Sequence, residues 1–481
     1  MYFPLRDELE GMNMNDDIKR HSPQQIRSAF TILAFVQATL IFTIALIIVP
    51  LPKIASEFSL SSANLLLVQV AYGLPFSGLL LFGGRLADRF RGRQMLVTGL
   101  IIFGAASVLA AIAPNFEMLV SMRFSQGVGA ALTAPALMAV LRTLFPNPAD
   151  FGKAMAVWGG VPFLGAIIGF ILPGILTNWI SWRWMFVVPV LVTAVAIAVA
   201  RPLLPADDNR TSANRPGLDP LGAVLVTLGI SLTSYGLIAS GDYTWSSSTV
   251  YVPFIVGIVL LIVFLIVERK VRYPLLPPGF ITEPRRITGL IGMFLAAAGS
   301  MLIEYVLTLY LQQIRGWSSL ATAVSFLPFA VTMIVANQIS APLIARFGVV
   351  RVLSAGGLVT AVGLGLLAWI SRDSAYAAIL LPGQILLAAG ISLVLSGSAV
   401  QSTANVEQHQ AGLAGGVMNM AMELGPTVGL TVLMAVAATQ PYAVQGYAWA
   451  FGAAGVLFIL FAIVASMLPR KSAGHVSQPG R

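Results

Sequence analysis

The stretch "LFGGRLADRFRGRQ" (Leu81–Gln94) places five charged residues within nine positions. The chain around it is 57% hydrophobic and only 10% charged, so this concentration of charge directly after a long apolar run requires an explanation. A mean hydropathy of +0.86 and 45 glycines among 481 residues are typical of a polytopic membrane protein. A soluble chain this apolar would aggregate.

The composition also excludes several kinds of site. Because the chain has no cysteine, it has no disulfide, no zinc–thiolate site and no cysteine nucleophile. The three histidines, His21, His409 and His475, lie in polar flanking segments and form no histidine metal cluster. No acidic metal motif accompanies them, so we expect no metal, no cofactor and no enzymatic activity.

Fourteen stretches are apolar enough, at about 20 residues each, to cross the bilayer. They begin near residues 29, 63, 94, 117, 154, 184, 220, 249, 287, 321, 352, 375, 411 and 447. The first 28 residues are polar and mixed in charge, without a small-residue cleavage site. We therefore expect the first span to be a retained anchor rather than a signal peptide.

Lysine and arginine predict the orientation of these spans. With the N-terminus placed in the cytoplasm, 23 basic residues fall in cytoplasmic segments and four fall on the other side. Arg123 is the one basic residue inside a span. This asymmetry predicts fourteen spans with both termini cytoplasmic. The fold class expected from the apolar spans is an all-α polytopic protein of the plasma (inner) membrane. The asymmetry also explains the isoelectric point near 10.0, so a nucleic-acid partner is not expected.

Polar segments predict the domain organisation. "RPLLPADDNRTSANRPGLD" (Arg201–Asp219) and "ERKVRYPLLPPGFITEPRR" (Glu268–Arg286) are rich in proline and charge, which favours connectors over helices. The predicted parts are a cytoplasmic tail at 1–28, a six-helix bundle at 29–205, a linker with two extra transmembrane helices at 206–286, a second six-helix bundle at 287–468 and a cytoplasmic tail at 469–481.

The two bundles repeat short pieces of sequence. "LADRFRGR" (Leu86–Arg93) returns loosely as "LIARFGVVR" (Leu343–Arg351), and "LGAIIG" (Leu164–Gly169) returns as "LGPTVG" (Leu424–Gly429). Repeated halves are typical of transporters that move two bundles around a site near the midplane of the bilayer.

The opening stretch is predicted to form the cytoplasmic turn between spans 2 and 3, and two interpretations of it remain. Its four arginines suffice to fix the topology. They do not explain Asp88, because acidic residues contribute little to orientation, nor Gly83, Gly84 and Gly92, which allow close helix approach. The alternative is a gate latch, in which Asp88 pairs with arginine and with the positive end of a neighbouring helix.

These motifs resemble signatures of the major facilitator superfamily. The inner-loop signature is matched by Gly84, Leu86, Asp88, Arg89, Gly92 and Arg93, with Arg91 as one extra residue before the second glycine. "MRFSQGVGAA" (Met122–Ala131) resembles the span-4 signature through Arg123, Gln126, Gly127 and Gly129. "SWRWMF" (Ser181–Phe186), "DPLGAVLVTLG" (Asp219–Gly229) and "ERKVRYPLL" (Glu268–Leu276) resemble the fourteen-span drug:proton antiporter branch. The resemblance covers residues 30 to 468.

The sequence departs from that branch at two positions. Thr43 stands where the branch usually has an aspartate in span 1, and Gly165-Ala166 replaces the usual Gly-Pro of span 5. The small-residue face of span 5, at Gly160, Gly165 and Gly169, is retained and predicts close helix packing. Both departures favour an alternative function as a symporter or facilitator for a specific metabolite.

Three ionisable residues lie well inside predicted spans: Arg123, Glu304 and Glu423. Each costs about 2.5–3.5 kcal/mol even on lenient scales, so each is a candidate for function. The resemblance implies that spans 1, 4, 9 and 12 line a central cavity, which makes Glu304 and Arg123 the leading proton-coupling candidates. Structural roles remain open for all three, with packing or gating the favoured role for Glu423.

Uncharged polar residues at membrane depth are candidates for the substrate path. Each of them can equally serve as a hydrogen-bonding contact between helices. They are Gln37, Gln69, Tyr72, Asn337, Gln384 and Asn419.

The resemblance implies a secondary active transporter that exports hydrophobic or amphipathic small molecules by alternating access, in exchange for protons. Its expected partners are a small-molecule substrate, protons and the lipid bilayer, and we expect a functional monomer. A non-transporting membrane sensor or scaffold is the alternative from another class. The intact inner-loop signature and the lack of a soluble signalling domain argue against it.

Overall fold

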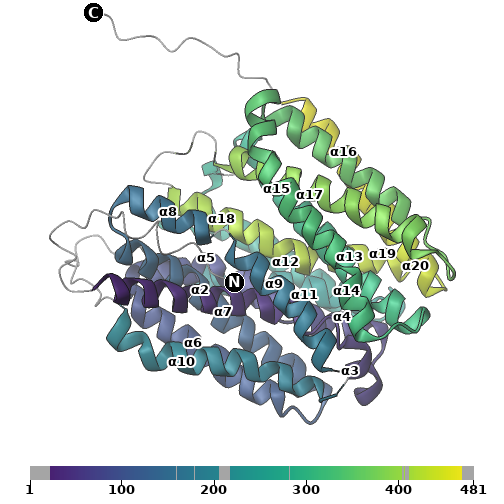
Figure 1. Cartoon of the computed structure of the whole chain (residues 1–481), viewed down its shortest axis with the longest axis horizontal. Helices are drawn as coiled ribbons and strands as arrows, with labels where there is room; N and C mark the ends of the chain where they lie inside the picture. The colour runs from purple at the N-terminus through teal and green to yellow at the C-terminus, as the bar shows by residue number, and fades with distance from the viewer. Residues whose placement is uncertain are drawn as a thin grey trace, which may run out of the picture. The chain divides into compact units, whose positions relative to one another are not determined.

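The computed structural model describes residues 22–158, 160–177, 179–204, 217–280, 282–403, 406 and 411–468, and their regular structure is helical (Figure 1). The chain divides into two compact units. Unit 1 falls within Met1–Leu228, Val271–Leu275 and Ser318–Ala323. Unit 2 falls within Gly229–Lys270, Leu276–Trp317 and Val324–Arg481.

Unit 1 contains the helices of the first half of the chain and the beginning of α11. They are α2 (Pro23–Ala45), α3 (Leu51–Phe58), α4 (Ser62–Val70), α5 (Gly73–Arg89), α6 (Gly92–Ala111), α7 (Phe116–Leu144), α8 (Pro148–Trp158), α9 (Val161–Leu176), η2 (Trp182–Phe186), α10 (Val187–Leu203) and α11 (Pro220–Ala239).

Unit 2 contains the end of α11 and the later helices, with α14 divided between the units. They are α12 (Ser248–Glu268), η4 (Pro278–Phe280), α13 (Pro284–Leu309), η5 (Tyr310–Ile314), α14 (Ser319–Ser325), α15 (Leu327–Phe347), α16 (Val349–Leu367), η6 (Tyr376–Leu380), α17 (Leu381–Ser402), α18 (Ala411–Leu424), η8 (Gly425–Gly429), α19 (Leu430–Ala437) and α20 (Ala443–Ser466).

Among the described residues, thirteen helices are long and apolar enough to cross a membrane. The fifth of the fourteen predicted spans is the exception, because it is divided into α8 and the shorter apolar helix α9. Pro162 lies in the first turn of α9, after Gly160 as its N-cap residue. Since proline has no backbone N–H, α8 cannot extend its hydrogen bonding through this position.

Glycine contacts bring the helices of unit 1 close together. α7 packs against α5 and α6, and α6 packs against α10, beside which it lies in Figure 1. A Cβ atom at Gly127 would overlap the carbonyl oxygen of Tyr72, and one at Gly129 would lie 2.6 Å from the backbone nitrogen of Phe103. Small residues therefore occupy the positions where the backbone of α7 approaches its neighbours most closely.

The predicted packing face of span 5 lies against α2. A Cβ atom at Gly165 would overlap the carbonyl oxygen of Ala38, and one at Gly169 would lie 2.7 Å from the Cβ atom of Ala45. Gly160 makes no such approach to another helix, since its nearest neighbour is Val157 at 3.5 Å. Two of the three glycines predicted for this face thus lie in a helix contact.

A polar cluster joins three connections at one end of unit 1. Glu57 of α3 accepts a hydrogen bond of 2.7 Å from the indole of Trp182 and forms an ion pair of 2.5 Å with Arg183. Arg183 also donates to the carbonyl oxygen of Ala113, which follows α6, at 3.0 Å. The cluster therefore fixes α3, η2 and the α6–α7 connection relative to one another.

Unit 2 is built around α13, which contacts α17, α18, α19 and α20. Close approaches of Gly289 to Ser402 and of Gly299 to Ile391 show that α13 and α17 run antiparallel. The π-helical segment η8 lies between α18 and α19 and contains Pro426. Single π-helical turns of this kind inside longer helices are frequent at functional sites.

We predict that Gly127→Ala lowers the thermal unfolding midpoint of the purified protein, because the added methyl group would push α7 away from Tyr72. Overpacking of this kind costs about 1–3 kcal/mol. Gly365→Ala is the matched control, since no atom lies within 4 Å of a Cβ atom at Gly365 in α16. Equal midpoints for the two variants would show that the Gly127 contact is not important for stability.

The Glu57 cluster predicts a stability that depends on pH. Burial raises the pKa of Glu57, but hydrogen bonds from Trp182 and Arg183 and the charge of Arg183 lower it more, so the net pKa lies below its ordinary value of 4.5. A carboxyl whose pKa falls on folding stabilises the protein above its unfolded pKa, and this contribution is lost as the pH falls through the folded pKa.

Between about pH 6 and pH 3, the unfolding midpoint of the wild type should therefore decrease more steeply than that of Glu57→Gln. Parallel curves for the two proteins would contradict the role given to the ion pair.

Candidate functional site

Arg123 lies in the first third of α7 and is fully buried, with no exposed surface. Its Nη1 atom donates to the carbonyl oxygen of Thr43 at 2.9 Å and to Oε1 of Gln126 at 3.4 Å. The ring of Tyr72 lies 5.1 Å from the guanidinium carbon. Gln126 in turn donates to the hydroxyl of Ser107 at 2.8 Å. Arg123 thus joins α2, α4–α5 and α6 through α7.

The positive charge of Arg123 is not neutralised by these neighbours. Its acceptors are uncharged, and its Nε and Nη2 atoms have no hydrogen-bond partner among the described residues. The acidic residues described in unit 1 lie at helix ends or in connections: Glu57, Asp88, Glu117, Asp150 and Asp219. A buried charge without a counter-ion is strongly destabilising, so this guanidinium favours any arrangement that brings an anion to it.

The hydroxyl of Thr43 does not replace the missing aspartate of span 1. It donates to the carbonyl oxygen of Thr39 at 2.7 Å, while Arg123 uses the backbone carbonyl of Thr43. Of the substrate-path candidates in unit 1, Tyr72 and Gln69 are buried and Gln37 is half-buried. The Tyr72 hydroxyl donates to the carbonyl oxygen of Leu40 at 3.2 Å.

Asp88 lies one residue before the end of α5 and is exposed. The charges of Arg142, at the end of α7, and of Arg85, one turn earlier on α5, act on its carboxylate. The extra residue of the signature, Arg91, adopts a positive φ of 20° and is the N-cap residue that precedes α6. The insertion is therefore accommodated by an unusual backbone conformation at the turn, and the helices on either side continue.

The remaining residues of the loop signature contact α7 and α10 or the turn itself. A Cβ atom at Gly92 would lie 3.0 Å from that of Ala139, whereas one at Gly84 would have 3.8 Å of space to Pro135. Arg89 stacks over the ring of Phe90, and Arg93 donates to the carbonyl oxygen of Leu204 at 3.4 Å.

The two membrane carboxyl groups of unit 2, Glu304 on α13 and Glu423 on α18, are half-buried. Their backbone oxygens accept hydrogen bonds from Thr308 and Thr427 within their own helices. In the part of the chain that the structure describes, neither carboxyl group has a hydrogen bond or an ion pair. Both side chains are therefore free to bind a proton or a ligand.

A polar candidate lies within about one helical turn of each carboxyl group. The register of α13 against α17, set by the Gly289–Ser402 and Gly299–Ile391 contacts, places Gln384 within about half a turn of the level of Glu304. Gln384 is fully buried. Asn419 lies four residues before Glu423, on the same face of α18, and is exposed.

Asn337, the last of the polar candidates, lies on α15 and is exposed. Its side-chain oxygen accepts a hydrogen bond of 3.3 Å from the Ser396 hydroxyl on α17. This contact is one of the two interpretations expected from the sequence, a polar link between helices.

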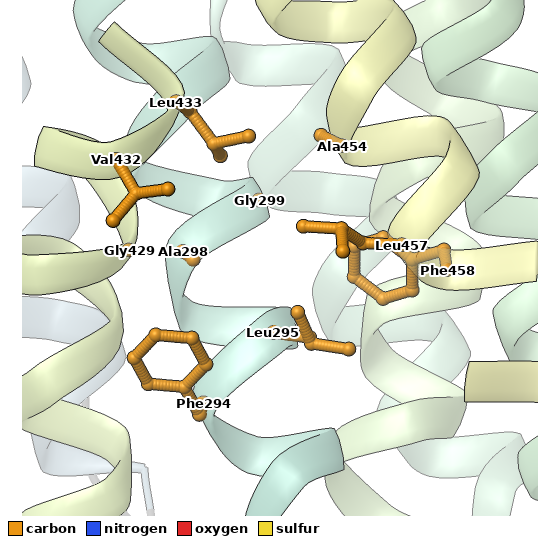
Figure 2. Close-up of a pocket in the computed structure, with 10 residues that line it drawn as sticks. All are labelled: Phe294, Leu295, Ala298, Gly299, Gly429, Val432, Leu433, Ala454, Leu457 and Phe458. Atoms are coloured by element: carbon orange, nitrogen blue, oxygen red, sulfur yellow. The ribbon is translucent and has the colours of Figure 1, made fainter. Parts of the chain in front are cut away.

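A small apolar pocket of about 80 Å³ lies in unit 2 among α13, η8, α19 and α20 (Figure 2). Figure 2 shows the rings of Phe294 and Phe458 directed toward the pocket, whose lining includes the glycines Gly299 and Gly429. All ten lining residues are apolar. The pocket has room for a small apolar group and offers no charge or hydrogen bond to a ligand.

The structure also shows contacts that sequence reasoning missed. Arg85 donates to three backbone carbonyl groups, and Glu57 pairs with Arg183 across 126 positions. Backbone carbonyls have no sequence signature. The sequence did contain a signal for the Glu57 contact. Glu57 is a single acidic residue between predicted spans 1 and 2, and Arg183 is a single basic residue between predicted spans 5 and 6, on the same predicted side of the membrane.

Comparison with known proteins gives the family. The model of the Major Facilitator Superfamily matches residues 31–287 and 289–481. A puromycin resistance protein of Streptomyces alboniger is 34% identical over 87% of this chain and 86% of its own length. A cephamycin export protein of Amycolatopsis lactamdurans is 31% identical over 89% of this chain and 90% of its own length.

The crystal structure of the POT family transporter PepTSo has the same fold, with a TM-score of 0.65 at 15% identity, over 93% of this chain and 97% of that chain. One conclusion follows from the helices of membrane-spanning length, the match to the family model along nearly the whole sequence, and this shared fold. The chain is a multi-pass membrane protein and belongs to the major facilitator superfamily.

Proposed function

We propose that this protein is a secondary active transporter that exports hydrophobic or amphipathic small molecules by alternating access, in exchange for protons. Relatives that match most of the chain support export, since they are named for resistance to puromycin and lincomycin and for export of cephamycin. The observation that carries proton exchange is the pair of carboxyl groups at Glu304 and Glu423 without a fixed partner.

The proposal places the protein in the plasma (inner) membrane with both termini in the cytoplasm. The distribution of 23 basic residues on one side and four on the other supports this orientation. We further propose that one chain is the functional unit, because a single chain contains both halves between which a substrate path would form.

Protonation gives the two carboxyl groups a role. A charged carboxylate at membrane depth is costly, and neither group has a cation beside it among the described residues of unit 2. Binding a proton removes that cost. Glu304 is the leading candidate because α13 corresponds to a span that the family resemblance places at the central cavity, while Glu423 adjoins the π-helical segment η8.

The uncompensated charge of Arg123 completes the proposed cycle. We propose that deprotonated Glu304 becomes its counter-ion during part of the cycle and that protonation releases it. The attraction of opposite charges in a medium of low dielectric constant makes this exchange strong enough to favour one conformation over another. One charge moved across 100 mV provides about 2.3 kcal/mol, enough for modest accumulation.

Asp88 is proposed to act as a latch of the cytoplasmic gate. The charges of Arg85 and Arg142, which act on its carboxylate, support an electrostatic interaction with arginine at the end of α5. The expected second contact of the latch is with the N-terminal end of the predicted span that begins near residue 411.

The test of the proposed function is Glu304→Gln, assayed for puromycin transport in inside-out vesicles. Glutamine keeps the shape and hydrogen bonding of glutamate but cannot titrate. We expect substrate binding to be retained, the pH dependence of transport to become flat, and accumulation to fall by up to about fiftyfold, the gradient that one proton supports across 100 mV.

Glu423→Gln is the matched control, because it makes the same chemical change on another helix of unit 2. It should change the transport rate and leave the pH dependence in place. If Glu304→Gln accumulates puromycin against a gradient with the pH dependence of the wild type, Glu304 does not carry the proton.

A second prediction concerns Arg123→Ala. Removing the counter-ion should abolish proton-driven net transport more severely than exchange of substrate for substrate, since exchange does not need the proton to be released. Arg123→Lys keeps the charge without the planar fork of donors and should retain part of the net transport. Equal loss of exchange and of net transport in Arg123→Ala would identify Arg123 as a structural hydrogen-bonding hub.

A further inference from the structure

Arg85, near the end of α5, contacts both connectors of the α11–α12 helix pair. Its Nη1 atom donates to the carbonyl oxygen of Gly217 at 3.2 Å and to that of Tyr273 at 2.6 Å. Its Nη2 atom donates to the carbonyl oxygen of Pro274. Gly217 leads into α11, and residues 273–274 follow α12, so one side chain joins the entry and the exit of the pair.

The two connectors also cross at this point. A Cβ atom at Gly217 would overlap the ring of Tyr273 and would lie 2.8 Å from the Cβ atom of Tyr273. Only a glycine leaves room for this approach, which brings the Gly217 and Tyr273 carbonyl oxygens within reach of one guanidinium group. The crossing and the three hydrogen bonds are all internal to unit 1.

A second contact, seven residues earlier on α5, supports the same arrangement. A Cβ atom at Gly78 would lie 2.7 Å from the Thr227 hydroxyl and 2.9 Å from its Cα atom, so α5 is in close contact with the first half of α11. Because Gly78 and Arg85 are two helical turns apart, they lie on one face of α5. This face of α5 therefore approaches α11 at Gly78 and the connectors of the pair at Arg85.

Three carbonyl groups are a set of partners that suits arginine in particular. The guanidinium group presents five donors in a rigid plane and can bind acceptors from two segments at once, whereas a lysine ammonium group is a single point of charge on a flexible stem. The positive-inside rule makes no such distinction, because lysine and arginine count alike in topology.

We propose that Arg85 is a positioning residue that anchors both connectors of the α11–α12 pair to the Asp88-bearing end of α5. Any movement of that end during transport then carries the connectors with it. The anchor is distinct from the proton exchange proposed above, and its structural test does not depend on the identity of the substrate.

The experiment uses the double variant Gly217→Cys/Tyr273→Cys in the full chain, which has no other cysteine. Removing the Tyr273 ring makes room for a side chain at position 217. The Cβ separation of 2.8 Å is shorter than the roughly 3.5–4.5 Å that a disulfide requires, so a small separation of the connectors brings the two cysteines into range. Disulfide formation is followed in native membranes with arginine, alanine or lysine at position 85. We expect rapid formation with arginine and a rate lower by about tenfold with either substitution, because charge-assisted hydrogen bonds are lost.

Arg93→Lys in the same double-cysteine background is the control, since Arg93 donates to the carbonyl oxygen of Leu204, after α10, at 3.4 Å. It should form the disulfide at the rate of the arginine protein. Failure of the disulfide to form with Arg85 present, or the same rate with arginine and lysine at position 85, would overturn the anchor.

A second measurement tests whether transport uses the anchor. In the cysteine-free chain, Arg85→Lys preserves the charge that fixes orientation, so expression and orientation should be unchanged. Its puromycin transport should nevertheless fall, because the connectors lose their anchor. Wild-type transport in Arg85→Lys would contradict the coupling of the connectors to the cycle. This arm alone rests on the proposed function. Absence of puromycin transport by the wild type would count against that function, while the disulfide result stands apart from it.

Discussion

A guanidinium group enclosed at membrane depth, with only neutral acceptors around it, is the constraint on which the proposed cycle depends. Arg123 is held by a backbone carbonyl, an amide and an aromatic ring, and these contacts fix its position without cancelling its charge. Unit 2 contains groups of the opposite kind: two carboxyl groups that lack a fixed partner among the described residues. Unbalanced charge in each unit gives a physical reason for a protein to bind protons and to change conformation as it does so.

That charge is kept in place by packing that has little to do with hydrophobicity. Lipid tails are as apolar as leucine, so helix association inside a membrane depends on close contact and on hydrogen bonds. Gly127 and Gly129 sit on α7 within two turns of Arg123, where α7 touches α5 and α6. The same helix therefore carries the buried charge and, close to it, the small residues that allow the backbones of neighbouring segments to approach.

The sequence was sufficient to predict features that depend on local composition. The length of apolar runs predicted the helices, and the scarcity of charge inside them identified Arg123, Glu304 and Glu423. The span-4 glycines, Gly127 and Gly129, were identified through the resemblance to the family's span-4 signature, and both lie where the backbones of two helices approach closely. The division of the fifth span was missed because Pro162 lies within an otherwise apolar run, and hydropathy alone does not record the missing backbone N–H.

Contacts between distant segments were beyond the reach of sequence reasoning. Arg85 appeared as one of four topology-setting arginines, and its three acceptors are backbone carbonyls that any residue can supply. The ion pair of Glu57 with Arg183 depends on the fold bringing two connections together. Gln384 shares the level of Glu304 through the register of two antiparallel helices, a relation that becomes visible only when both are packed.

The most direct test of proton exchange is to follow both solutes at once in wild-type protein. In sealed inside-out vesicles with an acidic lumen, puromycin uptake and lumenal pH are recorded together. Proton exchange predicts that each addition of puromycin raises the lumenal pH and that a protonophore collapses the accumulated puromycin. Accumulation that leaves the lumenal pH unchanged and persists with the protonophore would contradict the account.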